Sequence, residues 1–521
     1  MKNKTTTLSY IFVLFILFLI RIYGLNEIGL AEYDSVFNFQ IVQAMSQGDW
    51  QHLFQHGSPT FFIFFYCFYQ LFPSYLFLEY VNCLVSLFAV AYFVHTLAKA
   101  SHYEPLKEIL LLIFSGFSVF LVYSTRSFAI ESLSLLCFAL LFRQLLVTYQ
   151  TDKDVFFTAN NYLFWWIFTI FLTINYKILL ILPILFLLVL LKIFAYQTPK
   201  NILYFLYQSK KIVANISIIL LLPFALYTLI GVLLGLKWTA YIGHWVYVLV
   251  LRKNLNAWKP TYTFHTDIDF YFQYLAHYEN IVLLFGLLLA IYYLYQYLKR
   301  FENIISKNNI FFISSLFVVF TFALMSFLPK APRALLFILP LLYFLTFHFC
   351  VIVLDKIIQQ KKATYLLACF VLLNVLLQSY YLHEYIYRFT KTSYPLIANY
   401  LEQKKINKIA VTVSLNIYPF LPEHITMKQI LYAKELENLQ AMGYEYCLID
   451  DFTKIVGATG FENVATEYTT VLAVPEPTLI APIVYFEHCE FNSYTFEEAQ
   501  KVQKKMNEQS QHLRLVRLQK K

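Results

Sequence analysis

Two carboxylates lie one residue apart directly after the first apolar segment of the chain. They are Glu32 and Asp34, in the stretch Leu30–Phe39. The chain is otherwise sparing with charge, since only 14% of its residues are charged. A carboxylate can serve as a general base or as a metal ligand. The pair is therefore interpreted either as incidental acids of a solvated loop or as the centre of a site.

A helical pattern follows the two acids. Apolar residues recur at Val36, Phe39, Val42 and Met45, up to Gly48, which is the spacing of an amphipathic helix. Such a helix would lie along the membrane surface and hold the acids close to the bilayer. The pattern therefore favours a site over a solvated loop.

Further ionisable residues lie between apolar segments that end on the same side of the membrane as the two acids, in the topology that the loop charges predict. They are His56, Arg126, Glu131, Lys177, His265, Lys330 and Arg333. Ionisable groups at membrane depth usually face a cavity or each other, because facing lipid costs free energy. Arg and Lys can hold a phosphate. A cavity lined by both signs of charge therefore fits a substrate that carries hydroxyl groups and phosphate.

Glu131, Lys177 and His265 also have a plainer interpretation. Glu131 lies near the start of an apolar helix, where the helix dipole favours an acid. Lys177 can be an ordinary lysine in a tight turn that extends its ammonium group to the membrane interface. His265 belongs to an aromatic loop whose histidines lack metal-ligand spacing, and a substrate-gating loop is the alternative there. Lys330 and Arg333 run against the usual orientation of basic residues, which favours a phosphate-facing role.

The composition indicates a polytopic membrane protein. Of 521 residues, 59% are hydrophobic and 14% charged, whereas about a quarter of the residues of a soluble protein are charged. The net charge of +9 comes from basic residues in short loops between apolar segments. Such loops set the orientation of a membrane protein, and the clustered basic surface that binds nucleic acid is not seen.

Apolar runs long enough, or nearly long enough, to span a bilayer predict about eleven transmembrane helices. They cover about 8–24, 75–97, 108–124, 130–149, 161–175, 178–195, 212–235, 280–297, 309–328, 333–354 and 363–382. Basic residues occupy alternate loops, beginning with Lys2 and Lys4. By the positive-inside rule the N-terminus is cytoplasmic, and the opposite loops and the C-terminal part lie outside. We therefore expect a multi-pass protein of the inner (plasma) membrane.

From about residue 386 the charge content rises and the apolar runs shorten. Sequence patterns predict the helices Ser393–Lys404 and Ala433–Met442, and a third helix after a capping box at Thr495 and Glu498. The predicted strands are Lys408–Ser414, Glu445–Asp450, Val471–Val474, Val484–Glu487 and His512–Leu518. Strands that alternate with helices favour a small α/β domain with a partly parallel sheet.

These patterns divide the chain into two domains. Residues 1–385 are predicted to form an all-α polytopic membrane domain with the outer loops 25–74 and 236–279. Residues 386–521 are predicted to form the soluble extracytoplasmic α/β domain.

The chain resembles the GT-C superfamily of membrane glycosyltransferases, in particular the dolichyl-phosphate-mannose–protein mannosyltransferase and aminoarabinose-transferase group. The resemblance covers the whole membrane part, and its weight comes from the order of the motifs and their common face. The motifs are Glu32-Tyr33-Asp34 in the first outer loop, Gln47-Gly48-Asp49-Trp50, His56-Gly57-Ser58-Pro59, Glu131 preceded by Arg126, Lys177, and Arg333–Pro340.

The resemblance implies a GT-C-like fold and an inverting hexosyl- or pentosyltransferase. The donor would be a polyprenyl-phosphate-linked sugar, and the acceptor a lipid, glycan or protein on the outer face. Asp34 would be the general base and Glu131 the second catalytic acid, and both would hold a divalent cation, Mg or Mn, if one is used. The substrate-binding residues would be Glu32, His56, Arg126, Lys177 and Arg333. The predicted topology adds His265 and Lys330 to this set, because both lie on the same side of the membrane. The other expected partner is membrane lipid, with no nucleic acid.

Two other functions stay open at this point. One is a transporter or flippase of lipid-linked saccharides, which would carry inverted repeats and charges near the bilayer midplane. The sequence has no internal repeat, and its charges group at one face. The other is an inactive GT-C-like scaffold subunit of an envelope complex. A cavity that joins Asp34, Glu131 and Arg333 would argue against that function.

Overall fold

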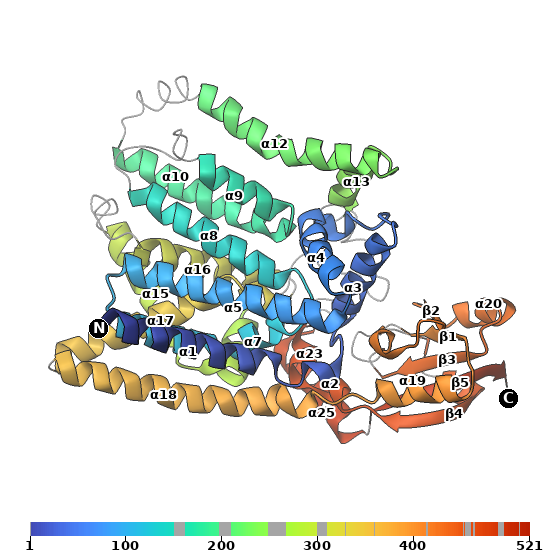
Figure 1. Cartoon of the computed structure of the whole chain (residues 1–521). Helices are drawn as coiled ribbons and strands as arrows, with labels where there is room; N and C mark the ends of the chain where they lie inside the picture. Colours follow the sequence, from blue (N-terminus) through green and yellow to red (C-terminus); the bar gives the residue numbers. More distant parts are fainter. Residues whose placement is uncertain are drawn as a thin grey trace.

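The structure is a computed structural model in which a bundle of helices carries a small sheet at one end (Figure 1). It describes residues 2–150, 162–196, 210–247, 267–299, 310–328, 330–358, 360–412, 415–451, 453, 460–461, 464–487, 494–509 and 511–520. The N-terminus and the sheet lie at opposite ends of the bundle (Figure 1).

Six segments of the described chain are long and apolar enough to cross a membrane. They are Thr7–Ile28, Tyr75–Ala100, Glu131–Thr148, Val213–Leu233, Leu339–Ile357 and Lys362–Gln403. The helices α6 (Pro105–Gly116) and α7 (Val119–Thr125) form a seventh apolar segment that is bent by 68°. These segments confirm a mostly helical membrane protein.

The expected count of about eleven spans is not confirmed. The runs expected at 161–175, 178–195, 280–297 and 309–328 form apolar helices of only 10–17 residues, which are Tyr162–Leu172, Tyr176–Leu188, Leu283–Lys299 and Ile310–Ser326. The apolar helix α4 (Pro59–Leu71) is equally short. The described residues therefore support six or seven of the expected spans by length and composition.

The remaining bounds complete the bundle. The longer helices begin with α1 (Lys2–Ile22), α5 (Tyr75–Ala100), α8 (Glu131–Gln150) and α9 (Tyr162–Leu172), and continue with α10 (Leu182–Tyr196), α12 (Lys210–Leu233), α15 (Leu283–Lys299), α16 (Ile310–Ser326), α17 (Leu339–Ile357) and α18 (Gln360–Tyr385). The shorter ones are α2 (Leu25–Ile28), η1 (Gln55–Gly57), η3 (Tyr176–Ile181), α13 (Ala240–Val246), α14 (Phe270–Tyr274), η6 (Leu275–Asn280), η8 (Pro332–Leu335) and η9 (Tyr387–Phe389). The helix α5 packs on α8, and α15 packs on α16 and α17.

The amphipathic helix expected after the acids is present as α3 (Tyr33–Ser46). Its apolar face, which includes Val36, Phe39 and Val42, is buried, and it packs on α4. Glu32 is the residue that precedes the first turn, and Asp34 lies within that turn. The buried face of α3 therefore fixes the direction in which both acids project.

A buried glutamate in η6 fixes the start of α7. Glu279 accepts hydrogen bonds from the backbone N–H of Phe120 (2.9 Å), from the hydroxyl of Ser118 and from the hydroxyl of Tyr343 (2.8 Å). Ser118 in turn caps α7 by accepting from the N–H of Leu121. A carboxylate that satisfies the free N–H groups at a helix start stabilises that end. Glu279 therefore holds the helix that carries Tyr123.

The C-terminal part contains a five-stranded sheet in the order β2-β1-β3-β5-β4. The strands are β1 (Lys408–Val411), β2 (Thr426–Gln429), β3 (Tyr446–Asp450), β4 (Tyr468–Pro475) and β5 (His512–Lys520). β1 pairs in parallel with β2 and β3, while β5 pairs in antiparallel fashion with β3 and β4. The expected partly parallel sheet is confirmed.

The helices of this part follow the prediction in most places. The described helices and turns are α19 (Tyr394–Gln403), η10 (Tyr418–Phe420), α20 (Glu435–Ala441), α22 (Val464–Glu467), η11 (Pro477–Ile480), α23 (Pro482–Glu487) and α25 (Phe496–Glu508). The capping box of Thr495 and Glu498 is confirmed. The strand expected at Val484–Glu487 is wrong, because these residues belong to the helix α23. A short apolar run does not distinguish strand from helix, and Pro482 is well suited to a first helical position.

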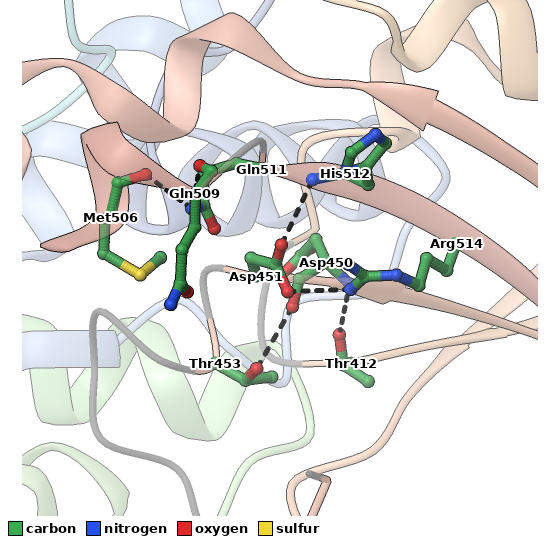
Figure 2. Close-up of polar contacts among 9 residues, drawn as sticks. All are labelled: Thr412, Asp450, Asp451, Thr453, Met506, Gln509, Gln511, His512 and Arg514. Carbon is green, nitrogen blue, oxygen red and sulfur yellow. Dashed lines mark hydrogen bonds and ion pairs between the residues drawn. The ribbon is translucent and has the colours of Figure 1, made fainter. Parts of the chain in front are cut away.

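Polar side chains tie the ends of three strands together (Figure 2). Asp451, just after β3, pairs with the Arg514 guanidinium at 2.9 Å and accepts from the backbone N–H of His512 at 3.1 Å. The Thr412 hydroxyl, just after β1, accepts from the N–H of Asp450 at 3.4 Å. The Thr453 hydroxyl donates to the Asp450 carbonyl at 3.1 Å. The cluster therefore stabilises the sheet from within.

The C-terminal segment 386–521, named the sheet domain after its strands, also contacts the helices directly. The Asn416 amide donates to the carbonyl of Ala31 at 3.2 Å, and the Tyr418 hydroxyl donates to Gln43 at 2.5 Å. These bonds attach the sheet domain to the same segment that carries Glu32 and Asp34.

Asp451→Ala should destabilise the sheet, because it removes a buried ion pair and the acceptor of a backbone N–H. We expect the free energy of unfolding to fall by about 1–3 kcal/mol, measured by thermal unfolding and by hydrogen exchange of β5 in the purified full chain. The matched control is Lys501→Ala, which removes an exposed pair with Glu497 in the same part of the chain and should have little effect. Equal effects of the two substitutions would contradict the role of the cluster.

Candidate functional site

A small cavity of about 20 Å³ gathers four carboxylates and one guanidinium. Its ionisable lining residues are Glu32, Asp34, Glu131, Arg333 and Glu487, with Tyr123 beside them. They come from the start of α3, the start of α8, η8, the end of α23 and α7. A cavity of this size holds about one water molecule. The cavity therefore brings together four acids and one arginine from distant parts of the chain.

Arg333 lies between two of the acids. Its Nε is 2.7 Å from Oε2 of Glu487, and its Nη1 is 3.6 Å from Oδ2 of Asp34. The Glu487 side chain is only 3% exposed, whereas that of Asp34 is 40% exposed. Asp34 is therefore the acid that a molecule from solution can reach, and Glu487 lies beneath it.

Glu32 is held by a hydrogen bond from the hydroxyl of Tyr123. Burial raises the pKa of Glu32, and the nearby charges of Asp34 and Glu131 add to this effect, while Arg333 and the Tyr123 bond oppose it. Burial disfavours the charged form of this carboxylate, while the hydrogen bond from Tyr123 fixes its position. A carboxyl group fixed in this way is suited to orienting a substrate. The same geometry makes it less accessible than Asp34.

Glu131 begins α8, at the helix end that favours a negative charge. Its Oε2 is buried and has no hydrogen-bond partner within the described part of the chain. A buried polar atom of this kind costs free energy unless water or a ligand satisfies it. Glu131 can therefore accept a hydrogen bond from a molecule in the cavity.

Glu487 is the site residue that the sequence did not predict. Burial raises its pKa to about 7, Arg333 opposes this rise, and the charges of Glu32 and Glu131 add to it. The available signal was an acid at the end of the apolar run Pro482–Phe486. A buried acid requires a partner, but the sequence does not indicate that the partner is Arg333.

A second, apolar cavity of about 280 Å³ adjoins the first. Its polar lining residues include Lys177 and Arg333, and the remainder is mostly apolar, from α8, η3, α16 and the segment after η8. Arg333 thus lines both cavities. One guanidinium therefore joins an acidic pocket to an apolar one.

Two predicted basic residues lie elsewhere. Arg126 donates to the carbonyls of Arg21 (3.1 Å) and Tyr23 (2.5 Å). Lys330 is buried and donates to three carbonyls at the end of α16, at 2.5–3.0 Å, one of them that of Ser326. Both side chains thus bind backbone oxygens, and neither lines the two cavities.

The two predicted histidines are not part of the cavity lining either. His56 lies in η1 with a positive φ of 56°, and its carbonyl accepts from the hydroxyl of Ser58. It lines neither cavity. His265 lies outside the described residues.

The cavity does not fit the Mg or Mn site expected at Asp34 and Glu131. In the described part of the chain, no group of three or more His, Cys, Asp or Glu side chains is arranged to hold a metal ion. The guanidinium of Arg333 also lies against two of the four carboxylates.

The fold is similar to that of a solved protein, ArnT. The ArnT of Cupriavidus metallidurans matches in the apo state with a TM-score of 0.58 and 10% identity, covering 100% of this chain and 99% of that one. The same protein bound to undecaprenyl phosphate matches with a TM-score of 0.54 and 10% identity, covering 98% of each chain. An oligosaccharyltransferase of Archaeoglobus fulgidus, in complex with Zn and sulfate, gives a TM-score of 0.47 at 12% identity, over 86% of this chain and 70% of that one.

The chain matches no protein-family model and no curated protein. The likeness to ArnT nevertheless covers nearly the whole chain, so the expected GT-C-like fold is confirmed.

The raised pKa of Glu487 predicts a pH-dependent effect on stability. An unperturbed Glu titrates near 4.5, and the folded value is about 7. Such a group contributes stability that is complete below the unfolded pKa and is lost as the pH rises through the folded pKa. Glu487→Gln removes this contribution. The thermal midpoint of the variant, relative to the unsubstituted chain, should therefore rise between about pH 5 and about pH 8.

Glu27→Gln, which removes an exposed acid in α2, is the matched control for this measurement. A midpoint difference between Glu487→Gln and the unsubstituted chain that stays constant over the same pH range would contradict the raised pKa.

Proposed function

We propose that this chain is a membrane glycosyltransferase that transfers a sugar from a polyprenyl-phosphate donor to an acceptor hydroxyl of a lipid, glycan or protein. The GT-C fold and the likeness to an ArnT that binds undecaprenyl phosphate support this proposal. The observation that carries it is the position of Arg333 on both the acidic and the apolar cavity.

The shape of the two cavities matches the parts of such a donor. The apolar cavity of about 280 Å³ suits the first units of a polyprenyl chain, because burying apolar surface is favourable. The phosphate would lie where the apolar chain ends, against Arg333 and Lys177, which both line that cavity. The sugar would then extend toward Asp34 and Glu131.

The proposed reaction is a single displacement at C1 of the sugar. The acceptor oxygen attacks C1 as its proton passes to a carboxylate oxygen of Asp34, the exposed acid of the cavity. The bond between C1 and the phosphate oxygen breaks, and its electron pair leaves with the phosphate. Arg333 and Lys177 stabilise the charge that develops there. One displacement inverts the configuration at C1.

The other acids have supporting roles in this proposal. Glu32, fixed by Tyr123, and Glu131, with its buried and unpartnered Oε2, would accept hydrogen bonds from sugar or acceptor hydroxyls. Such bonds orient the acceptor for attack. His56 and Arg126 stay proposed substrate contacts on the basis of the resemblance, and His265 and Lys330 on the basis of the predicted topology.

The two alternatives agree less well with the site. A transporter is expected to carry its charged residues near the bilayer midplane. Here Glu32, Asp34 and Glu131 lie at helix starts, and the segment that carries Glu32 and Asp34 contacts the sheet domain. For an inactive scaffold, a cavity that joins Asp34, Glu131 and Arg333 is not expected, and one cavity contains all three.

Asp34→Asn should abolish transfer, because the amide cannot take the proton from the acceptor. We expect less than about 1% of the transfer of the unsubstituted chain, in line with the loss of a general base. The measurement is mass spectrometry of envelope glycans and glycoproteins from cells that lack the chain and are complemented with each variant. Glu27→Gln, at an exposed position in α2, is the control and should restore the product. Restoration by Asp34→Asn would show that Asp34 is not the base.

Lys177→Met should weaken binding of the carrier, because it removes a cation from the apolar cavity at little change in length. We expect the affinity of the purified chain for undecaprenyl phosphate in detergent to fall about ten-fold. Lys237→Met, at an exposed position, should leave the affinity unchanged. Equal affinities for the Lys177 variant and the unsubstituted chain would place the phosphate elsewhere.

A further inference from the structure

We propose that Glu487 is a positioning residue: the sheet domain uses it to hold the Arg333 guanidinium in the orientation that binds the phosphate of the donor. This inference rests on the proposed function, because it assumes that Arg333 binds that phosphate. Under this inference the sheet domain contributes one residue, Glu487, to a site whose other ionisable residues belong to the membrane part.

The hydrogen bond between the two residues restricts how the guanidinium can turn. Oε2 of Glu487 lies 2.7 Å from Nε of Arg333. Nε is the inner donor of the guanidinium, and the two terminal nitrogens carry the other four N–H groups. Bonding Nε fixes the plane of the guanidinium and directs the terminal nitrogens toward the cavities. Nη1, at 3.6 Å from Asp34, is placed in this way.

Burial separates Glu487 from the acids that could do chemistry. Its side chain is 3% exposed, whereas that of Asp34 is 40% exposed. A carboxylate in this position is poorly placed to meet an acceptor from solution. It is well placed to form a charge-assisted hydrogen bond that water does not weaken.

The helix that carries Glu487 is anchored on both sides. The residues Ile483, Tyr485 and Phe486 of α23 are buried, and α23 packs on α25 and η8. At the start of α25, the backbone N–H of Phe496 donates to Asp267 of the membrane part at 2.7 Å. Glu487 is therefore delivered to Arg333 by a packed helix.

Hydrogen bonding and charge can be separated by substitution. In Glu487→Gln the amide oxygen can still accept from Nε, but the negative charge that competes with a phosphate is gone. In Glu487→Ala both are lost, and in Glu487→Asp the charge remains while the carboxylate is one methylene too short to reach Nε. A positioning role therefore predicts that Gln binds the phosphate at least as well as Glu, and that Ala and Asp bind it less well.

The experiment measures the affinity of the purified full chain for undecaprenyl phosphate in detergent. We expect Glu487→Ala and Glu487→Asp each to weaken binding about ten-fold, and Glu487→Gln to bind within about three-fold of the unsubstituted chain or tighter. The control is Glu476→Ala, which removes another buried acid of the same domain, bonded to Ser393 and Thr392 and not to Arg333. It should lower the thermal midpoint without weakening binding.

A double-mutant cycle separates this inference from the proposed function. If Glu487 acts through Arg333, Glu487→Ala should have no further effect in an Arg333→Ala background. Unchanged binding by Arg333→Ala alone would overturn the proposed phosphate site. Weak binding by Arg333→Ala together with normal binding by Glu487→Ala and Glu487→Asp would overturn only the positioning role. Tighter binding by both Ala and Gln at position 487 would also overturn it, because Glu487 would then be a competitor of the phosphate.

Discussion

The ion pairs of Arg333 are the interaction on which the site depends. Four carboxylates line a cavity of about 20 Å³. Because the cavity is partly shielded from water, the negative charge of each carboxylate disfavours ionisation of the others. A guanidinium keeps its charge under such conditions and can bond to more than one acid. Arg333 does so with Glu487 and Asp34. The three segments that meet here, α3, η8 and α23, are therefore joined by one side chain.

Most elements were predictable because they depend on local patterns. The helix α3 follows from apolar spacing, and the helix α25 from the capping box of Thr495 and Glu498. The strand expected at Val484–Glu487 was wrong, because the structure of a short apolar segment depends on what surrounds it. A run buried in protein can be a short helix in either part of the chain, and composition does not show which surroundings it has.

The site was predictable only where topology constrained it. Asp34, Glu131, Lys177 and Arg333 were grouped because loop charges assign them to one side of the membrane, and the structure places all four on the two adjoining cavities. Lys330 was grouped with them for the same reason, yet its ammonium binds backbone carbonyls at the end of α16. Topology predicts on which side of the membrane a residue lies, but not which group it binds. A lysine on that side can bind the free carbonyls of a helix end instead of a substrate.

Glu487 is the converse case, because it is a residue of the site that the sequence did not predict. Its chemistry follows from burial, which raises its pKa to about 7, and from a partner 154 positions earlier in the chain. Neither can be inferred from the residues around it. Once the partner is known, the two acids beside Arg333 differ in a consistent way, since the buried one can hold the guanidinium while the exposed one meets the solvent. The docking of the sheet domain onto the segment before α3, through Asn416 and Ala31, then has a chemical consequence as well as a structural one, because it brings the buried acid to the site.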